Sequence, residues 1–247
     1  AWAREPRGRY QAVFLGEAAD ISERPFGRRG PTRRSWAEQH TAIVGHVLSF
    51  DVASLGDRTS SKARLGYGPE PLIVVSVGGT AAGAQLLRRC LQAFPLVRRE
   101  IPAASMILVG GPRLDTRIEQ LSAGAEVRGH VPRLYEHFAA CDLAVVQGGA
   151  TTTLELTVLQ RPFLFAPLRD HCEQRRHVAA RQARLGAGIP FDLEHMHAGG
   201  LGRLMLSDIG RDVHYPPVPT DGARRIAQLV LRSTLGDGKA RTGTPST

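Results

Sequence analysis

The sequence lacks the features that mark secreted, disulfide-bonded or membrane-spanning chains. Its only cysteines, Cys90, Cys141 and Cys172, are odd in number and show no CxxC spacing, which argues against a disulfide framework and a zinc knuckle. The longest run that looks buried, residues 72–77, is far shorter than the ~20 residues of a membrane span, and the N-terminus has no signal-peptide pattern. We therefore expect a cytoplasmic protein, soluble or peripheral at the inner face of the membrane.

Aromatic residues and lysine are also scarce. Aromatics make up 6% of the chain, and Lys62 and Lys239 are the only lysines, so the formal net charge of +9 comes from arginine. The basic residues are spread along the chain and form no basic arm. Nucleic-acid-binding surfaces combine clustered basic residues with aromatics, so this composition argues against nucleic acid. It favours small anionic ligands or acidic lipid headgroups instead.

What is present is the composition of an ordinary globular domain. The chain has 247 residues, of which 42% are hydrophobic and 22% are charged. This length is about 1.6 times a typical domain, which predicts one large domain with an appendage rather than two full-sized lobes. The chain begins at Ala1 without an initiator Met, so we expect a processed product or a piece of a longer protein.

The pattern of apolar residues changes near residue 70. Residues 1–70 hold short apolar pieces around a Pro/Gly/Arg stretch and predict a partly irregular segment. From residue 71, short β-branched runs alternate with amphipathic stretches, which is typical of a Rossmann-like parallel sheet flanked by helices, the α/β class. The expected strands are residues 72–77, 106–109, 125–128, 143–146 and 163–165. The expected helices are residues 82–94, 132–140, 151–159 and 173–185.

The C-terminal region is predicted to hold one more helix. Residues 221–235 are amphipathic, and we expect them to pack back on the fold to complete a domain of residues 71–235. Residues 236–247 are small and polar, which predicts a disordered tail.

Two segments run from a strand through glycines into a helix. The first is Ser-Val-Gly-Gly-Thr-Ala-Ala-Gly at residues 76–83, and the second is Gln-Gly-Gly-Ala-Thr-Thr-Thr-Leu-Glu at residues 147–155. Glycine admits close approach of a ligand, and the N-terminus of the following helix favours an anion such as a diphosphate. Neither segment is a GxGxxG fingerprint or a Walker A loop. A purely structural turn is the competing interpretation of the first segment.

Polar side chains follow these turns. Glu155, in the second turn of its expected helix, can accept hydrogen bonds from two adjacent hydroxyls of a ribose. The competing interpretation is an exposed acid favoured by the helix dipole. The segment Pro-Leu-Arg-Asp-His-Cys-Glu-Gln at residues 167–174 places an acid and an amide where they can bind a sugar ring. Helix N-capping by Asp170 competes with that interpretation and leaves Gln174 unassigned.

At this point the chain resembles a known family. The motifs are Val-Gly-Gly-Thr (77–80), Gly-His-Val-Pro (129–132), Asp-Leu-Ala-Val-Val-Gln-Gly-Gly-Ala-Thr-Thr-Thr-Leu-Glu (142–155), Pro-Phe-Leu-Phe-Ala-Pro-Leu (162–168) and Glu-Gln (173–174). Their order resembles the C-terminal nucleotide-sugar half of GT-B glycosyltransferases, in particular family 28, the group of the peptidoglycan lipid II N-acetylglucosaminyltransferase and its actinobacterial relatives. The resemblance covers about residues 70–235.

The resemblance implies a set of donor-binding residues. It places Gly79 and Thr80 beside the diphosphate or acceptor crevice, and has the backbone of Val131 read the uracil edge. It assigns Glu155 to the ribose, and Glu173 and Gln174 to the donor sugar. It assigns the helix N-terminus under the diphosphate to Gly149, Ala150, Thr151 and Thr152.

The resemblance gives less support to the remaining candidate residues. Arg113 can add positive charge at the same sheet edge, with a surface role as the competing interpretation. His130 and His171 lie near the expected crevice, where hydrogen bonding or packing is favoured over a role as catalytic base. The catalytic base is not identified, and no cofactor is expected. Because these loops contain no DxD-like acidic pair, no metal is expected either, and helix N-termini would stabilise the leaving diphosphate.

The implied activity is that of a hexosyltransferase: transfer of a sugar from a UDP-sugar, in particular a UDP-N-acetylhexosamine such as UDP-GlcNAc, with inversion. Residues 1–70 are too short for the acceptor lobe of a GT-B enzyme and resemble the segment that links the two lobes. We therefore expect an acceptor lobe in cis or as a separate chain, and no transfer by this chain alone. The alternatives are a UDP-N-acetylglucosamine 2-epimerase-like enzyme and a non-catalytic nucleotide-sugar-binding subunit.

Overall fold

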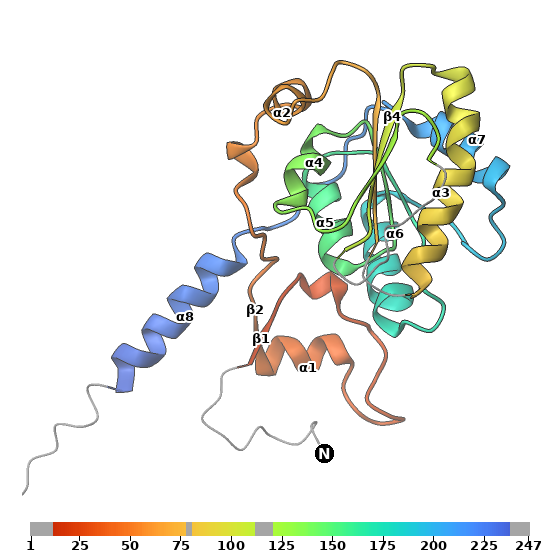
Figure 1. The fold of residues 1–247 in the computed structure, drawn as a ribbon. Coiled ribbons are helices and arrows are strands. Elements are labelled where there is room, and N and C mark those ends of the chain that lie inside the picture. The colour runs from red at the N-terminus through yellow and green to blue at the C-terminus, as the bar shows by residue number, and fades with distance from the viewer. Residues whose placement is uncertain (1–11, 78–80, 112–120, 238–247) are drawn as a thin grey trace, which may run out of the picture. The chain divides into compact units, whose positions relative to one another are not determined.

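The computed structural model describes residues 12–77, 81–111 and 121–237 (Figure 1). The chain divides into two compact units. The larger unit comprises Phe50–Pro216, and the smaller unit comprises the residues before Phe50 together with those from Pro217 onward.

The larger unit is built on a parallel sheet of six strands in the order β5-β4-β3-β6-β7-β8. The strands are β3 (Leu72–Ser76), β4 (Ser105–Val109), β5 (Ala125–Arg128), β6 (Leu143–Val146), β7 (Phe163–Phe165) and β8 (Ile189–Pro190). The five expected strands are confirmed to within one residue at each end. The sixth, β8, has only two residues and gave no signal in the sequence.

Helices lie on both sides of this sheet (Figure 1). They are α2 (Arg58–Arg64), α3 (Ala81–Glu100), α4 (Leu134–Ala140), α5 (Ala150–Val158), α6 (Ala179–Leu185) and α7 (Ala198–Asp208), with a 3-10 turn η2 (Val52–Ser54) and a π-helical segment η3 (Glu173–Val178). Helices α3 and α7 pack on each other and cover one face, while α4 and α5 lie on the other. The expected α/β fold is confirmed.

The strands form because they are buried on both faces. Leu72–Ser76 and Leu143–Val146 are apolar along almost their whole length and are buried, as expected for central parallel strands. On the side of α3 and α7, Phe94 and Met205 pack in one core with Ile73. Gly202 lets the two helices approach closely, because a Cβ there would lie 3.1 Å from the carbonyl oxygen of Ala93.

Several helix limits differ from the sequence prediction. The helix expected to begin at Pro132 begins at Leu134, because Arg133 takes a left-handed backbone conformation with φ of 53°. The expected helix 173–185 is confirmed in extent but begins with the π-helical segment η3 before α6. Gly186 ends α6 with φ of 60°, the C-terminal cap that its position predicted. Helix α7 was not predicted.

The boundary between the two compact units lies near residue 50, whereas the sequence predicted a domain that begins at residue 71. Within the segment that was expected to be a linker, Lys62 is buried, and its Nζ lies 2.6 Å from Asp142 Oδ2 and 2.7 Å from the carbonyl oxygen of Glu70. Asp142 Oδ2 also accepts a hydrogen bond from the backbone N–H of Leu72 (2.8 Å). These contacts hold residues 50–70 on the amino end of the sheet, so they belong to the larger unit.

The smaller unit contains short elements. A parallel pair, β1 (Ala12–Phe14) and β2 (Thr41–Ile43), accompanies the 3-10 turn η1 (Ala18–Asp20), α1 (Arg33–His40) and α8 (Gly222–Asp237). The helix expected at 221–235 is therefore present, and it belongs to the smaller unit, where Val230 and Leu231 are 55% and 58% exposed. The rest of the tail, residues 238–247, lies outside the described residues. Across the described ranges, no helix combines the length and apolar character that a bilayer crossing requires.

Candidate functional site

The order of the strands identifies the edge of the sheet where a ligand is expected. From β3, the chain adds β4 and β5 on one side, and later β6, β7 and β8 on the other. The order therefore reverses between β3 and β6, and open parallel sheets bind ligands at the carboxyl ends of the strands at such a point. The loop after β3 falls there, but Gly79 and Thr80 lie outside the described residues, as does Arg113 after β4.

The turn after β6 requires glycine. Gly148 has φ of +89°, and a Cβ at this position would lie 3.3 Å from the Cα of Pro167. Both the conformation and the close approach disfavour any side chain. Gly148 thus brings the loop after β6 into contact with the loop after β7.

Helix α5 begins directly after this turn and presents free backbone donors. Gly149 is the N-cap and makes no side-chain cap, and the first backbone hydrogen bond of the helix runs from Thr153 N to Gly149 O (3.1 Å). The N–H groups of Ala150, Thr151 and Thr152 precede that bond, as at any helix start. Thr151 is exposed and Thr152 half-buried. Together with the helix dipole, these groups form a place suited to an anion.

Arg181, on α6, supports the first turn of α5. Its Nη2 donates to the carbonyl oxygen of Ala150 (2.7 Å) and to Thr153 Oγ1 (3.1 Å), and its side chain is buried. Sequence reasoning missed this residue. The available signal was an arginine among the buried positions of the expected helix, between Val178 and Leu185.

Glu155 lies on the same face of α5 as Thr151 and Thr152, because positions three and four residues apart are neighbours on a helix. It is half-buried, and burial raises the pKa of its carboxyl group to about 7. Among the described residues, this carboxyl group makes no hydrogen bond or ion pair. The competing interpretation was an exposed acid favoured by the helix dipole, and it does not fit a half-buried side chain. Glu155 is therefore a half-buried hydrogen-bonding group beside a helix N-terminus, with no polar partner in the part of the chain that the structure describes.

The loop after β7 holds the next group of predicted residues. Gln174 is buried, and its Oε1 accepts a hydrogen bond from the backbone N–H of Leu168 (2.9 Å). Its oxygen therefore fixes the loop, and only its Nε2 is left to donate to a ligand. His171 and Glu173 are exposed. Asp170 is not an N-cap, because the helical segment begins after Cys172 without a side-chain cap.

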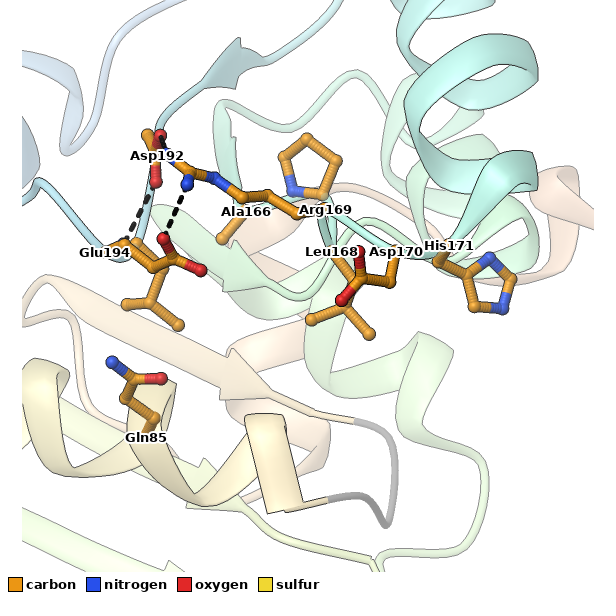
Figure 2. Close-up of a pocket in the computed structure, with 10 residues that line it drawn as sticks. Gln85, Ala166, Leu168, Arg169, Asp170, His171, Asp192 and Glu194 are labelled. Atoms are coloured by element: carbon orange, nitrogen blue, oxygen red, sulfur yellow. Dashed lines mark hydrogen bonds and ion pairs between the residues drawn. The ribbon is translucent and has the colours of Figure 1, made fainter.

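A pocket of about 360 Å³ opens beside this loop (Figure 2). It is lined by residues 166–171, residues 192–194 and Gln85 of α3. Arg169 pairs with Asp192 and with Glu194, at 2.7 Å in each case. Figure 2 shows these three side chains close together beside the pocket. Hydrogen bonds from Arg169 and His195 hold the pKa of Asp192 well below its usual range. Because Arg169 is paired with these two acids, and Asp170 adds a further acidic side chain to the lining, the pocket carries no excess positive charge.

Val131 lies at the opposite edge of the sheet from β8. It follows β5, whose pairing with β4 continues through Gly111 N to Gly129 O (3.0 Å). Val131 is half-buried and its neighbour His130 is exposed. The structure thus brings the predicted residues of the β6 and β7 loops together, while Val131 stands at the carboxyl end of the edge strand.

Residues of the types that bind metals form a cluster in the smaller unit. In the part of the chain that the structure describes, one group of three such residues has its ligand atoms within 4.8 Å of one another: Glu17, Asp20 and His46. His46 Nε2 lies 3.5 Å from Asp20 Oδ2. These residues belong to the smaller unit and were not predicted as a site.

Known proteins resemble this chain at low identity. The chain is 25% identical over 198 residues to the UDP-N-acetylglucosamine--N-acetylmuramyl-(pentapeptide) pyrophosphoryl-undecaprenol N-acetylglucosamine transferase of Mycolicibacterium smegmatis, covering 75% of this chain and 50% of that protein. It is 28% identical over 145 residues to the lipid-A-disaccharide synthase of Paramagnetospirillum magneticum, covering 53% of this chain and 36% of that protein. The chain thus spans about half the length of the first relative and less of the second. No protein-family model matches.

Solved structures show the same fold. The glycotransferase of kitacinnamycin matches with a TM-score of 0.55 and 19% identity over 79% of this chain and 50% of that chain. The Methanocaldococcus jannaschii UDP-GlcNAc 2-epimerase, solved in complex with UDP-GlcNAc and UDP, matches with a TM-score of 0.56 and 14% identity over 78% of this chain and 55% of that chain. The resemblance to family-28-type GT-B glycosyltransferases is confirmed. The relatives do not test the individual site residues.

Proposed function

We propose that the larger unit is the nucleotide-sugar-binding lobe of an inverting glycosyltransferase, and that its donor is a UDP-sugar, in particular a UDP-N-acetylhexosamine. The observation that carries this proposal is Glu155, a half-buried carboxyl group on the same face as the open N-terminus of α5, with no hydrogen-bond or ion-pair partner in residues 12–77, 81–111 and 121–237. A ligand with a diol next to a diphosphate satisfies both features at once. A nucleoside diphosphate has this pattern.

The parts of the donor are assigned from this anchor. The diphosphate lies on the N–H groups and hydroxyls of Thr151 and Thr152, and the ribose hydroxyls donate to Glu155. The sugar lies toward the β7 loop, where His171, Glu173 and the Nε2 of Gln174 are available. The base lies toward Val131, whose backbone reads its edge.

In the proposed reaction, an acceptor hydroxyl attacks the anomeric carbon and the bond to the diphosphate breaks with inversion. Negative charge then develops on the leaving diphosphate. The fixed N–H dipoles at the start of α5 are oriented toward that charge before the reaction begins. The base that takes the hydroxyl proton is expected from an acceptor lobe, in cis or on a partner chain. We propose the cytoplasm, at the inner face of the membrane, as its location.

Calorimetry with UDP, TDP, GDP and ADP tests the proposal. We expect UDP to bind most tightly, and replacement of Glu155 by Ala to weaken UDP binding by roughly 1–3 kcal/mol, the scale of a charge-assisted hydrogen bond. Glu100→Ala is the matched control, because Glu100 ends α3 and pairs with Arg99 on the surface. Absence of binding by every nucleotide at millimolar concentration would exclude the proposal.

The epimerase alternative predicts different chemistry with the same ligand. Its motivation is the fold shared with the UDP-GlcNAc 2-epimerase. Incubation of UDP-GlcNAc with this chain in D₂O distinguishes the two functions, because epimerisation at C2 exchanges the C2 hydrogen and glycosyl transfer does not. Binding without either reaction, even when an acceptor lobe is supplied, would identify a non-catalytic subunit.

A further inference from the structure

Residues 50–67, which the sequence placed in a linker, make two aromatic contacts with α4. Phe50 stacks on Tyr135 with ring centroids 4.3 Å apart and planes inclined by 17°. Tyr67 meets His137 edge to face, with ring centroids 5.7 Å apart. Tyr135 is the second and His137 the fourth of the seven residues of α4. The segment therefore fixes the beginning of that helix.

The hydroxyl of Tyr67 is the centre of a polar network. It lies 2.7 Å from His137 Nδ1 and accepts a hydrogen bond from Arg128 Nη1 (3.2 Å). Because the arginine can only donate, the hydroxyl keeps its own proton, which it can donate to His137 Nδ1 in the tautomer that leaves this nitrogen unprotonated. Burial, followed by the charge of Arg128, lowers the pKa of His137, in agreement with this arrangement.

Arg128 is itself fixed from the opposite side. Its Nε and Nη2 each donate to the carboxylate of Glu126 at 2.8 Å. Two parallel bonds of this kind fix orientation as well as distance. The guanidinium group therefore has little freedom to move relative to β5, and the hydroxyl of Tyr67 is tied to that strand.

The network spans one loop. Arg128 is the last residue of β5 and His137 is the fourth residue of α4, so residues 129–133 form the connection between the two anchored points. Arg133 closes this loop in a left-handed conformation, with φ of 53°. Val131 is at its centre. One hydroxyl from a segment about 60 residues earlier in the chain thus joins both ends of the loop.

We propose that Tyr67 is a positioning residue that sets the base preference of the nucleotide site by fixing residues 129–133. The inference rests on the proposed function, in which the backbone of Val131 reads the base. Backbone groups discriminate between bases only when their positions are fixed, because a mobile loop can satisfy the edges of several bases. Loss of the hydroxyl should therefore affect recognition of the base more than recognition of the diphosphate.

The experiment measures the Kd values of UDP and ADP for the wild-type chain and for Tyr67→Phe. Tyr67→Phe removes both hydrogen bonds of the hydroxyl, and we expect it to weaken UDP binding about three- to tenfold while it changes ADP binding much less. The ratio of the ADP Kd to the UDP Kd should therefore fall. A purely structural role would leave this ratio unchanged. Tyr215→Phe is the matched control, because the hydroxyl of Tyr215 donates to the carbonyl oxygen of Arg161 at the amino end of the sheet.

A second variant keeps the test independent of folding. His137→Phe removes the acceptor and leaves the tyrosine ring in place, so it should lower the same ratio, and the double variant should lower it no further. An unchanged ratio in variants of a chain that binds UDP would overturn the role of Tyr67 alone. Failure of the wild-type chain to bind any nucleotide would overturn the proposed function and this inference together.

Discussion

Lys62 and Asp142 form an ion pair of 2.6 Å with side chains that are 8% and 11% exposed. The pair joins α2 to the residue that precedes β6. Asp142 also binds the first residue of β3 through the backbone N–H of Leu72. One carboxylate thus connects two central strands with a segment that shows no apolar periodicity of its own.

Replacing Lys62 with Met should lower the free energy of unfolding, by less than the about 3–5 kcal/mol that an uncompensated buried charge costs. The carboxylate of Asp142 would keep one cation, the half-buried Arg58, whose Nη1 lies 3.3 Å from Asp142 Oδ1. Urea unfolding of the larger unit measures the loss. The double variant Lys62→Met with Asp142→Asn should be more stable than Lys62→Met alone, since the amide oxygen still accepts from Leu72 and no charge remains buried. A double variant less stable than the single one would contradict this account.

Replacing Glu155 with Gln should stabilise the chain at high pH while it weakens nucleotide binding. Burial raises the pKa of Glu155 from 4.5 to about 7, so the folded state favours the protonated form. Its contribution to stability is therefore present below pH 4.5 and is lost as the pH rises through 7. Melting temperatures of the two proteins should agree near pH 4.5 and diverge toward pH 8, with the variant higher. A difference that does not depend on pH would exclude burial of the charge as the cause.

Replacing Gly148 with Ala should destabilise the chain by about 1–3 kcal/mol, because the left-handed conformation is strained for alanine and the new Cβ meets Pro167. UDP binding should weaken as well, since the loops after β6 and β7 can no longer keep their spacing. Gly149→Ala is the control for stability: its φ is −64° and no atom lies within 4 Å of an added Cβ. Equal melting temperatures for the two variants would argue against the strain.

The isolated chain should bind donor and transfer no sugar at a meaningful rate. In-line orientation of two reactants can account for ~7–11 kcal/mol of a barrier, and that orientation requires a group facing the donor site. Slow hydrolysis of a UDP-sugar is compatible with this expectation. Release of UDP, measured with and without an added acceptor lobe, tests it. Full turnover on an acceptor by this chain alone would show that residues 1–70 do more than link two lobes.

The sheet could be predicted because its central strands are buried on both faces and carry continuous apolar runs, as Leu72–Ser76 does. Gly148 and Glu155 could be identified from the strand–glycine–helix pattern. The role of residues 50–70 could not be predicted, because their contacts with the sheet and α4 are polar or aromatic and join residues far apart in the chain. Tyr67, for example, bonds to Arg128 and His137, which are 61 and 70 positions away. Local periodicity carries no information on such pairs.

The hydrogen bond between Gln174 and the backbone of Leu168 could not be predicted from the sequence either. A Gln beside a Glu at the start of a helix indicates ligand contact and backbone contact equally well. The structure assigns the amide oxygen to Leu168 and leaves the nitrogen available. A residue can thus serve both the loop and a ligand with its two terminal atoms.

The π-helical segment Glu173–Val178 has a consequence for natural and engineered length variation. At its end, the N–H of Ala179 bonds to the carbonyl oxygen of Gln174, five residues earlier instead of four. Deleting one residue between them would restore the ordinary four-residue spacing of an α-helix. The residues before the deletion would then be rotated by one helical step, about 100°, relative to α6. Gln174 would then face away from Leu168 while α6 stayed in place. Homologous chains one residue shorter here are therefore expected to anchor this loop with a different side chain.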